Sequence, residues 1–163
     1  MTTCDEGPVD NTVDAITDAL LTASRLLVAI SARSIADVDE SITIPQFRSL
    51  VILSSRGSIN LATLAGLLGV QPSTTGRMVD RLVTTGLIDR RPHPNSRREL
   101  LVELSSRGHD FVRMVTARRR EEIARVVQNM PVRERQGLVR ALTAFTASGA
   151  EPAAHIDIDD QTF

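Results

Sequence analysis

The sequence predicts a mainly α-helical protein with one small β-hairpin. Apolar residues recur every three or four positions over most of the chain, which is the period of an amphipathic helix. Alternation with a period of two is confined to residues 87–91 and 99–104, which a turn-rich loop connects. The length of 163 residues favours one domain with an added assembly element over two domains.

The composition narrows the class of protein further. Hydrophobic residues make up 42% and charged residues 24%, as in a soluble globular protein. Aromatic residues are only 2%, without Tyr or Trp, which argues against binding by base stacking or by aromatic-lined sugar pockets. The longest uninterrupted apolar run has five residues, 26–30, far fewer than the roughly 20 of a membrane span. Since the N-terminus lacks a cleavable apolar segment and Cys4 is the lone cysteine, we expect a cytoplasmic protein without membrane contact.

The formal net charge of −1 hides a strong segregation of charge along the chain. Residues 1–40 carry two arginines against eight acids, and residues 141–163 carry four acids and no base. Residues 41–140 carry 17 arginines against eight acids, a net charge of +9. A basic block of this kind is the electrostatic footprint of a surface that binds a polyanion.

The N-terminal part of the chain is predicted to contain one helix. Residues 1–11 are polar and are expected to form a disordered arm, and residues 12–36 form the helix. A second apolar face, with Leu21, Leu26 and Val28, exceeds what a surface helix needs. The helix is therefore either wholly buried in the core or in contact with a second subunit. In so short a chain we favour the second interpretation, a dimerisation helix.

The middle of the chain contains three predicted helices followed by the hairpin. Pro stands at a first-turn position of the first and third helices, Asn60 caps the second, and glycine follows each of them. The predicted helices cover residues 44–57, 61–68 and 72–86. Residues 92–98 are predicted as the loop of the hairpin.

The C-terminal part is predicted to contain two further helices. The first starts at Ser105 or Ser106 and continues to about Asn129. Pro131 opens the second, which continues to Gly149 and is expected to turn four apolar side chains inward: Leu138, Val139, Leu142 and Phe145. Residues 150–163 are acidic and aperiodic, which predicts a disordered tail.

Residues 61–82 carry the most specific pattern in the sequence. A small residue, Ala65, lies four positions before Gly69, so two helices can cross closely at a turn where glycine supplies a positive φ. This pattern predicts a helix-turn-helix, and the hairpin behind it makes a winged helix. Thr75 occupies a core position where Val or Ile is usual, and we expect its hydroxyl to bond to the carbonyl of Gln71 at some cost in stability.

The second helix of this motif predicts contacts with double-stranded DNA, because it enters the major groove with its N-terminal end leading. Its outward polar residues are Gln71, Ser73, Thr74, Arg77, Arg81 and Thr84. Ser73 and Thr74 lie where helix-end amides bind phosphate, while Arg77 is the candidate for a base edge. Arg81 is the candidate for a phosphate. The alternative for both arginines is a solvated surface, with Arg81 paired to an acid of the same chain.

The hairpin adds further basic candidates. Arg97 and Arg98 are predicted to project from its loop, which Pro92 and Pro94 restrict. A guanidinium on a narrow arm can enter a minor groove, where negative potential is concentrated. Arg90 and Arg91 on the first strand would support the phosphates. The alternative for the tip is a basic, solvent-exposed loop.

The run LATLAGLLGVQPSTTGRMVDRLVTTGLIDRRPHPNSRRELLVELSSRG resembles the winged helix of the MarR family of bacterial transcriptional regulators. Together with the flanking helices, the resemblance covers residues 13–147. It implies a homodimer in which residues 12–36 and 105–149 interlock and residues 44–104 form the DNA-binding region. Such a dimer presents two winged helices to a pseudo-palindromic operator.

The resemblance also carries over to particular residues. Ser73, Thr74 and Arg77 match the groove-reading positions of the family, and Arg97 matches its wing-tip arginine. Many members have an acid one residue before that arginine, which steadies the wing. This chain has Ser96 there, which predicts a less rigid wing.

Members of the family often respond to small anionic aromatic compounds bound between the dimer helices and the winged helix. In a chain without Tyr or Trp, such an effector pocket would use Phe47, Phe111 and Met114, with an arginine for a carboxylate. Other members sense oxidants through a cysteine near the first helix. Cys4 is the candidate here, and an inert thiol is the favoured alternative.

Patterns for metal binding and catalysis are not found in the sequence. The three histidines are scattered without metal-ligand spacing, so we expect no metal and no other cofactor. A nucleophile elbow, a phosphate-cradling glycine loop and an H-E-x-x-H motif are all missing, which argues against an enzyme. Three hypotheses remain: a dimeric DNA-binding repressor released by an effector, a DNA-binding protein without an effector, and a winged helix that binds other proteins. The candidate base-edge arginine and the basic wing favour the first two.

Overall fold

A computed structural model of the chain describes residues 11–149, so the predicted tail and all but the last residue of the predicted arm lie outside it. Within this range the helices are α1 (Val13–Ala36), α2 (Ile44–Arg56), α3 (Leu61–Leu68), α4 (Pro72–Thr84), α5 (Ser106–Asn129), α6 (Val132–Arg135) and α7 (Leu138–Ser148). The strands are β1 (Ile59–Asn60), β2 (Ile88–His93) and β3 (Ser96–Leu104). The mainly α-helical class with a small β element is confirmed.

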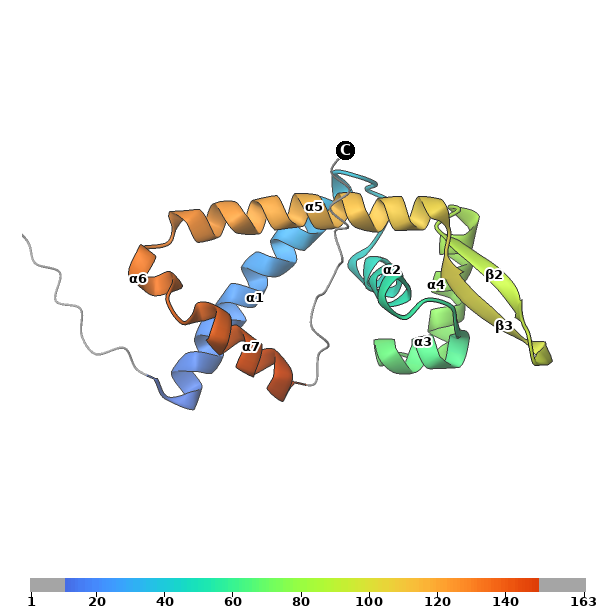
Figure 1. Ribbon diagram of the computed structural model, residues 1–163, viewed down its shortest axis with the longest axis horizontal. Coiled ribbons are helices and arrows are strands. Elements are labelled where there is room, and N and C mark those ends of the chain that lie inside the picture. Colours follow the sequence, from blue (N-terminus) through green and yellow to red (C-terminus); the bar gives the residue numbers. More distant parts are fainter. Residues whose placement is uncertain (1–10, 150–163) are drawn as a thin grey trace, which may run out of the picture.

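The long helix α5 organises the molecule (Figure 1). The helices α2, α3 and α4 and the β2–β3 hairpin lie below one end of α5, and α1, α6 and α7 lie below the other. Both α1 and α2 contact α5, and β2 contacts α4. The helix-turn-helix and its hairpin are therefore gathered at one end of the described chain.

Side-chain caps determine where most helices begin. In α2, the Thr43 hydroxyl accepts a hydrogen bond from the Gln46 N–H, and the Gln46 side chain accepts one from the Thr43 N–H at 2.8 Å. This reciprocal capping box satisfies two N–H groups that the helix itself leaves open. Single side-chain caps are present at Thr12, Asn60 and Ser105. The helices α2, α3, α4 and α5 begin where the sequence predicted.

The core lies between α2, α4, the sheet and the first half of α5. Its largest fully buried side chains include Leu50, Leu53, Leu64, Val79, Leu82, Leu87, Ile88, Val112 and Val115. The start of α5 packs so closely on the chain after α4 that a Cβ atom on Gly108 would lie 2.1 Å from the Leu87 carbonyl oxygen. Glycine at residue 108 is therefore required by packing.

The three strands form one antiparallel sheet in the order β1-β3-β2. The strand β1 was not predicted, because its two residues carry no alternating pattern and are recognised only through their pairing with Val102 and Leu101. The hairpin is also longer than predicted. The strands extend to His93 and from Ser96, so the predicted loop over residues 92–98 is wrong and the turn is Pro94–Asn95.

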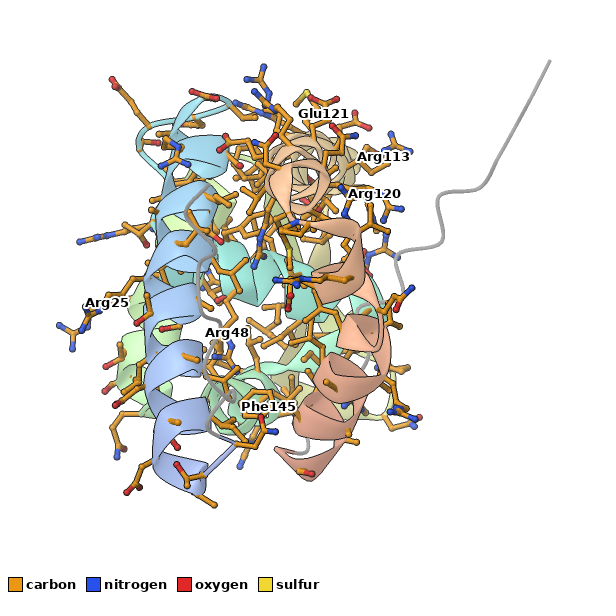
Figure 2. All side chains as sticks on the ribbon, turned by 90° about the vertical axis from the view of Figure 1, so that its left-hand side faces the viewer. Arg25, Arg48, Arg113, Arg120, Glu121 and Phe145 are labelled. Carbon is orange, nitrogen blue, oxygen red and sulfur yellow. The ribbon has the colours of Figure 1, made fainter. Side chains whose placement is uncertain are left out.

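The predicted last helix is broken into α6 and α7. Gly137 adopts a φ of 78°, in the left-handed region, and redirects the chain between them. The side chains expected to point inward do not form a core within the described chain: Val139, Leu142 and Phe145 are 79%, 46% and 55% exposed. Figure 2 shows α7 standing apart from α1, with Phe145 extending into the space between the two helices.

The helix α1 is packed at one end only. Near its C-terminus Ile30, Ser34 and Ile35 are buried, and Arg33 forms an ion pair with Glu122 of α5 at 2.9 Å. Along the rest of α1 large apolar side chains are exposed, among them Ile16, Leu21, Leu26, Leu27 and Val28. By length and composition alone α1 would suffice to cross a membrane, which the count of uninterrupted apolar residues did not reveal. A helix in the interior of a soluble protein or subunit interface meets the same test.

Candidate nucleic-acid interface

One glycine builds the turn between α3 and α4. Gly69 has a φ of 67°, and the following N–H, of Val70, donates back to the Ala65 carbonyl at 3.2 Å. The Ala65 side chain is buried, so the two helices approach closely. The predicted helix-turn-helix and the role of Gly69 in it are confirmed.

Thr75 lies fully buried between the helices. Its hydroxyl donates to the carbonyl of Gln71 at 3.2 Å, the bond predicted from the sequence. The same carbonyl already accepts the Thr75 N–H at 3.0 Å. The hydroxyl is therefore satisfied inside the core, and the departure from Val or Ile does not change the fold.

The helix α4 turns its predicted polar face to solvent. The exposed residues on it include Gln71, Ser73, Thr74, Arg77 and Arg81. Since α4 has no side-chain hydrogen bond at its N-cap, the N–H groups of Ser73 and Thr74 in its first turn are open to an external acceptor. A phosphate suits this position, because the helix dipole and these N–H groups both favour an anion.

Arg77 and Arg81 lie one turn apart on α4 and both line an open groove of about 260 Å³. The other wall of this groove is the start of α2, with Thr43, Pro45 and Gln46. Arg77 Nε is 3.5 Å from the Ser73 carbonyl oxygen, which is a marginal hydrogen bond. In the part of the chain that the structure describes, Arg81 forms no ion pair, so the alternative pairing with an internal acid does not occur there. Both guanidinium groups are available to an anion.

Arg90 forms the internal ion pair instead. Its guanidinium contacts the Asp80 carboxylate on α4, and this pair connects β2 to α4. Arg91, the next residue, pairs with Glu103 across the hairpin. Both strand arginines are therefore engaged within the chain. The Arg90 pair holds the wing, which consists of β2, β3 and the turn at residues 94–95, against α4, and the Arg91 pair joins the two strands of the wing.

Arg97 and Arg98 lie in β3 rather than in a loop, and both are exposed. The strand pairing is irregular at this point: Pro92 faces Leu100, whereas His93 faces Ser96. Residues 97–99 are therefore additional on β3 and form a bulge next to the turn. The bulge keeps both arginines at the outer end of the wing, as the sequence predicted for them.

The contact between Asn60 and Glu99 was missed by the sequence analysis. Asn60 Nδ2 donates to Glu99 Oε1 at 2.5 Å, between residues 39 positions apart. The sequence identified Asn60 only as the cap of α3. The contact could have been predicted only together with the pairing of β1 and β3, because that pairing brings Asn60 beside Glu99.

The predicted effector residues are not brought together as a pocket. Phe47 and Phe111 are each 5% exposed and pack edge to face in the core, with ring centroids 6.2 Å apart. Met114 is 51% exposed on α5. Across residues 11–149, no group of three or more His, Cys, Asp or Glu side chains is placed to hold a metal ion. Cys4 lies outside the described residues.

One carboxylate near this region has a shifted pKa. Asp39, in the connection between α1 and α2, accepts hydrogen bonds from the Ser41 hydroxyl at 2.6 Å and the Ser41 N–H at 2.9 Å. These bonds, helped by the positive charge of Arg107, lower the pKa of Asp39 below its ordinary value of 3.8. The carboxylate is ionised at neutral pH, and its two hydrogen bonds hold the chain at Ser41, two residues before the N-cap of α2.

Comparison with known proteins gives matches along the same residues. The model of the MarR family matches residues 42–100. An uncharacterized HTH-type transcriptional regulator of Mycobacterium bovis is 28% identical over 106 residues, which are 65% of this chain and 74% of that protein. The multiple antibiotic resistance protein MarR of Salmonella typhimurium is 39% identical over 67 residues, 41% of this chain and 46% of that protein.

Solved structures extend the likeness to the helices outside the motif. The crystal structure of RV1404 from Mycobacterium tuberculosis is 73% identical, covers 90% of this chain and 99% of its own, and has a TM-score of 0.82. A mutant of MarR from E. coli complexed with operator DNA is 21% identical, covers 90% of this chain and 100% of its own, and has a TM-score of 0.64. At 21% identity the similarity to this MarR structure concerns the fold alone.

Proposed function

The chain belongs to the MarR family of transcriptional regulators, and from this premise we propose that it binds a pseudo-palindromic DNA site as a homodimer and represses transcription there. It acts in the cytoplasm, where bacterial DNA lies. The observation that carries the proposal is the exposed face of α4. This face combines an N-terminus without a side-chain cap with two arginines, Arg77 and Arg81, that form no ion pair among residues 11–149.

These groups have distinct tasks on a DNA duplex. The first-turn N–H groups of α4 and the hydroxyls of Ser73 and Thr74 bind a phosphate and fix the register of the helix. Arg77, farther along α4, reaches a base edge in the major groove, where guanidinium binds guanine with two hydrogen bonds. Arg81 contacts a phosphate, and Arg97 with Arg98 contacts the neighbouring minor groove.

The homodimer is supported by apolar surfaces that the described chain leaves uncovered. The N-terminal half of α1 and one side of α7 expose large apolar side chains, and the main contacts of α7 are with the short α6. A second copy of the chain would bury both surfaces, and removing this apolar area from water lowers the free energy. Two recognition helices in such a dimer must lie about 34 Å apart to reach successive major grooves.

We include release by a small anionic or aromatic effector in the proposal. An anion in the groove between α2 and α4 would occupy Arg77 and Arg81 and compete with DNA for them. Small aromatic acids such as benzoate derivatives are therefore the first compounds to add to a preformed protein–DNA complex. If an acid releases the duplex at unchanged salt concentration, effector control is supported. If DNA binding is unchanged with all the acids tested, regulation by such an effector is not supported.

The first experiment is fluorescence anisotropy with the duplex upstream of the protein's own gene and a scrambled duplex of equal composition. Both are titrated over a salt series. We expect tighter binding to the native duplex and a linear fall of log affinity with log salt, because several phosphates are neutralised. Steep salt dependence without preference would mean that the operator lies elsewhere. Failure to bind any duplex would favour the alternative, a winged helix that binds other proteins.

A further inference from the structure

We propose that Asn60 and Glu99 are positioning residues that hold the arginine-bearing bulge of the wing in one orientation for DNA. The inference rests on the proposed DNA binding and extends it to residues that do not themselves touch the duplex. It starts from the hydrogen bond between Asn60 Nδ2 and Glu99 Oε1.

The orientation of the Asn60 amide is determined by its other partner. Its Oδ1 accepts the Thr63 N–H at 2.8 Å as the N-cap of α3. Nδ2 therefore points away from α3 and is left to donate to Glu99. One half-buried side chain thus joins the start of the helix-turn-helix to the wing.

Glu99 occupies the last position of the bulge at residues 97–99. On its inner side the sheet is regular, with Asn60 facing Leu101 across β1 and β3. Glu99 lies two residues from Leu101 and shares its face of the strand, so it is the diagonal neighbour of Asn60. The Asn60–Glu99 hydrogen bond therefore anchors the bulge next to the point where regular pairing of β2 and β3 ends, at Pro92 and Leu100. Glu99 is also adjacent to Arg98 in the chain.

The charge of Glu99 suits this place. Its carboxylate lies at the N-terminus of α3, where the helix dipole favours an anion. Of the other acids in the wing and on α4, Glu103 pairs with Arg91, Asp80 pairs with Arg90, and Asp89 lies at the base of the hairpin, opposite Glu103. Glu99 is therefore the acid that restrains the outer end of the wing, and it does so through Asn60 rather than through an arginine.

The test compares two neutral variants of the full chain, Glu99→Gln and Glu99→Ala. Both remove the negative charge near DNA, but only the alanine variant removes the oxygen that accepts the Asn60 bond. We expect Glu99→Ala to bind the operator roughly five- to tenfold more weakly than Glu99→Gln, because the freed bulge at residues 97–99 must be ordered on binding. Equal affinities of the two variants would overturn the proposal. Thermal melting checks that both variants are folded.

Repeating the pair in an Arg97→Ala, Arg98→Ala background separates positioning from a general effect on the fold. If Glu99 acts through these arginines, the difference between its two variants disappears in that background. A difference that persists unchanged would overturn the assignment.

Hydrogen exchange of the DNA-free protein gives a readout that does not need an operator. Amides of residues 97–99 should exchange faster in Glu99→Ala than in Glu99→Gln, while amides at the base of the hairpin stay protected. Equal exchange in the bulge would contradict the anchor. If the wild type bound no duplex while the exchange difference was present, the proposed function would fail and the anchor itself would stand.

Discussion

Arg77 is the residue on which sequence discrimination is expected to depend. Its guanidinium is exposed on α4, and its contact within the described chain is a marginal one with the carbonyl of Ser73 on the same helix. We predict that Arg77→Ala lowers the preference for operator over scrambled DNA by about 1–3 kcal/mol and lowers non-specific affinity less. Arg81→Ala is the matched control, and it should weaken both duplexes equally and reduce the salt slope by about one. An equal loss on both duplexes for Arg77→Ala would make it a phosphate contact.

Gly108 illustrates a residue whose importance is purely steric. A Cβ atom there would collide with the Leu87 carbonyl oxygen, which accepts the Ser105 N–H at 3.1 Å. We predict that Gly108→Ala destabilises the protein by about 3 kcal/mol, measured by urea denaturation. Gly76→Ala is the control, because its Cβ would meet only a Leu61 methyl at 3.6 Å and should raise stability by up to about 1 kcal/mol. Equal stability of the Gly108 variant and the wild type would refute the close approach.

Asp39 should make stability depend on pH at the acidic end. Its pKa is lower in the folded chain than its ordinary value, so the carboxylate stabilises the fold above that value. This contribution is lost as the pH falls through the folded-state pKa. Asp39→Asn should therefore lower the free energy of unfolding at pH 7 by less than about 1 kcal/mol, seen as a lower melting temperature, and the difference should shrink below about pH 4. A difference that is constant from pH 7 to pH 3 would exclude the carboxylate as its source.

Among the elements, the wing is the one whose contribution to binding can be removed without touching helix packing. Arg97 lies in the bulge of β3, away from the core and from the apolar faces of α1 and α7. We predict that Arg97→Ala weakens operator binding by on the order of 1–3 kcal/mol and leaves the molecular mass in solution unchanged. Light scattering checks the mass. Wild-type affinity in this variant would remove the wing from the interface.

The helices of the DNA-reading motif could be predicted closely because their ends are encoded locally. Asn60, Gly69 and Pro72 act on their own neighbours, so cap, turn and first-turn position are all visible in the sequence. The candidate residues of α4 were predicted for the same reason, since a helical period sorts them from the buried Val79 and Leu82. The structure places these candidates on one exposed face.

Elements that depend on distant partners could not be predicted in this way. The strand β1 exists because two residues pair with β3, and the Asn60–Glu99 bond exists because of that pairing. The break before α7 was missed because apolar spacing continues across Gly137, and one glycine in a helical pattern is often tolerated. The ion pair between Arg90 and Asp80 likewise depends on how the wing folds back.

At the scale of the whole molecule, the apolar surfaces of α1 and α7 predict association of two chains. The exposed apolar residues of α1 and α7 are at the end of α5 away from the helix-turn-helix. We predict that Phe145→Glu converts a dimer into a monomer, because a carboxylate would have to be buried at the subunit contact. Leu67→Glu is the matched control, since that leucine is exposed on α3 outside this surface and its variant should stay dimeric. Light scattering distinguishes the two masses, and a Phe145 variant that remains dimeric would place the contact elsewhere.

The length of α5 has a mechanical consequence for such a dimer. Its 24 residues make a rod of about 36 Å, with subunit contacts at one end and the DNA-reading end at the other. The rod is a lever: a tilt of about 5° at the subunit end displaces the opposite end by about 3 Å. That displacement is close to one base-pair step, so a small change in how two subunits meet is enough to bring both reading heads into or out of phase with the duplex.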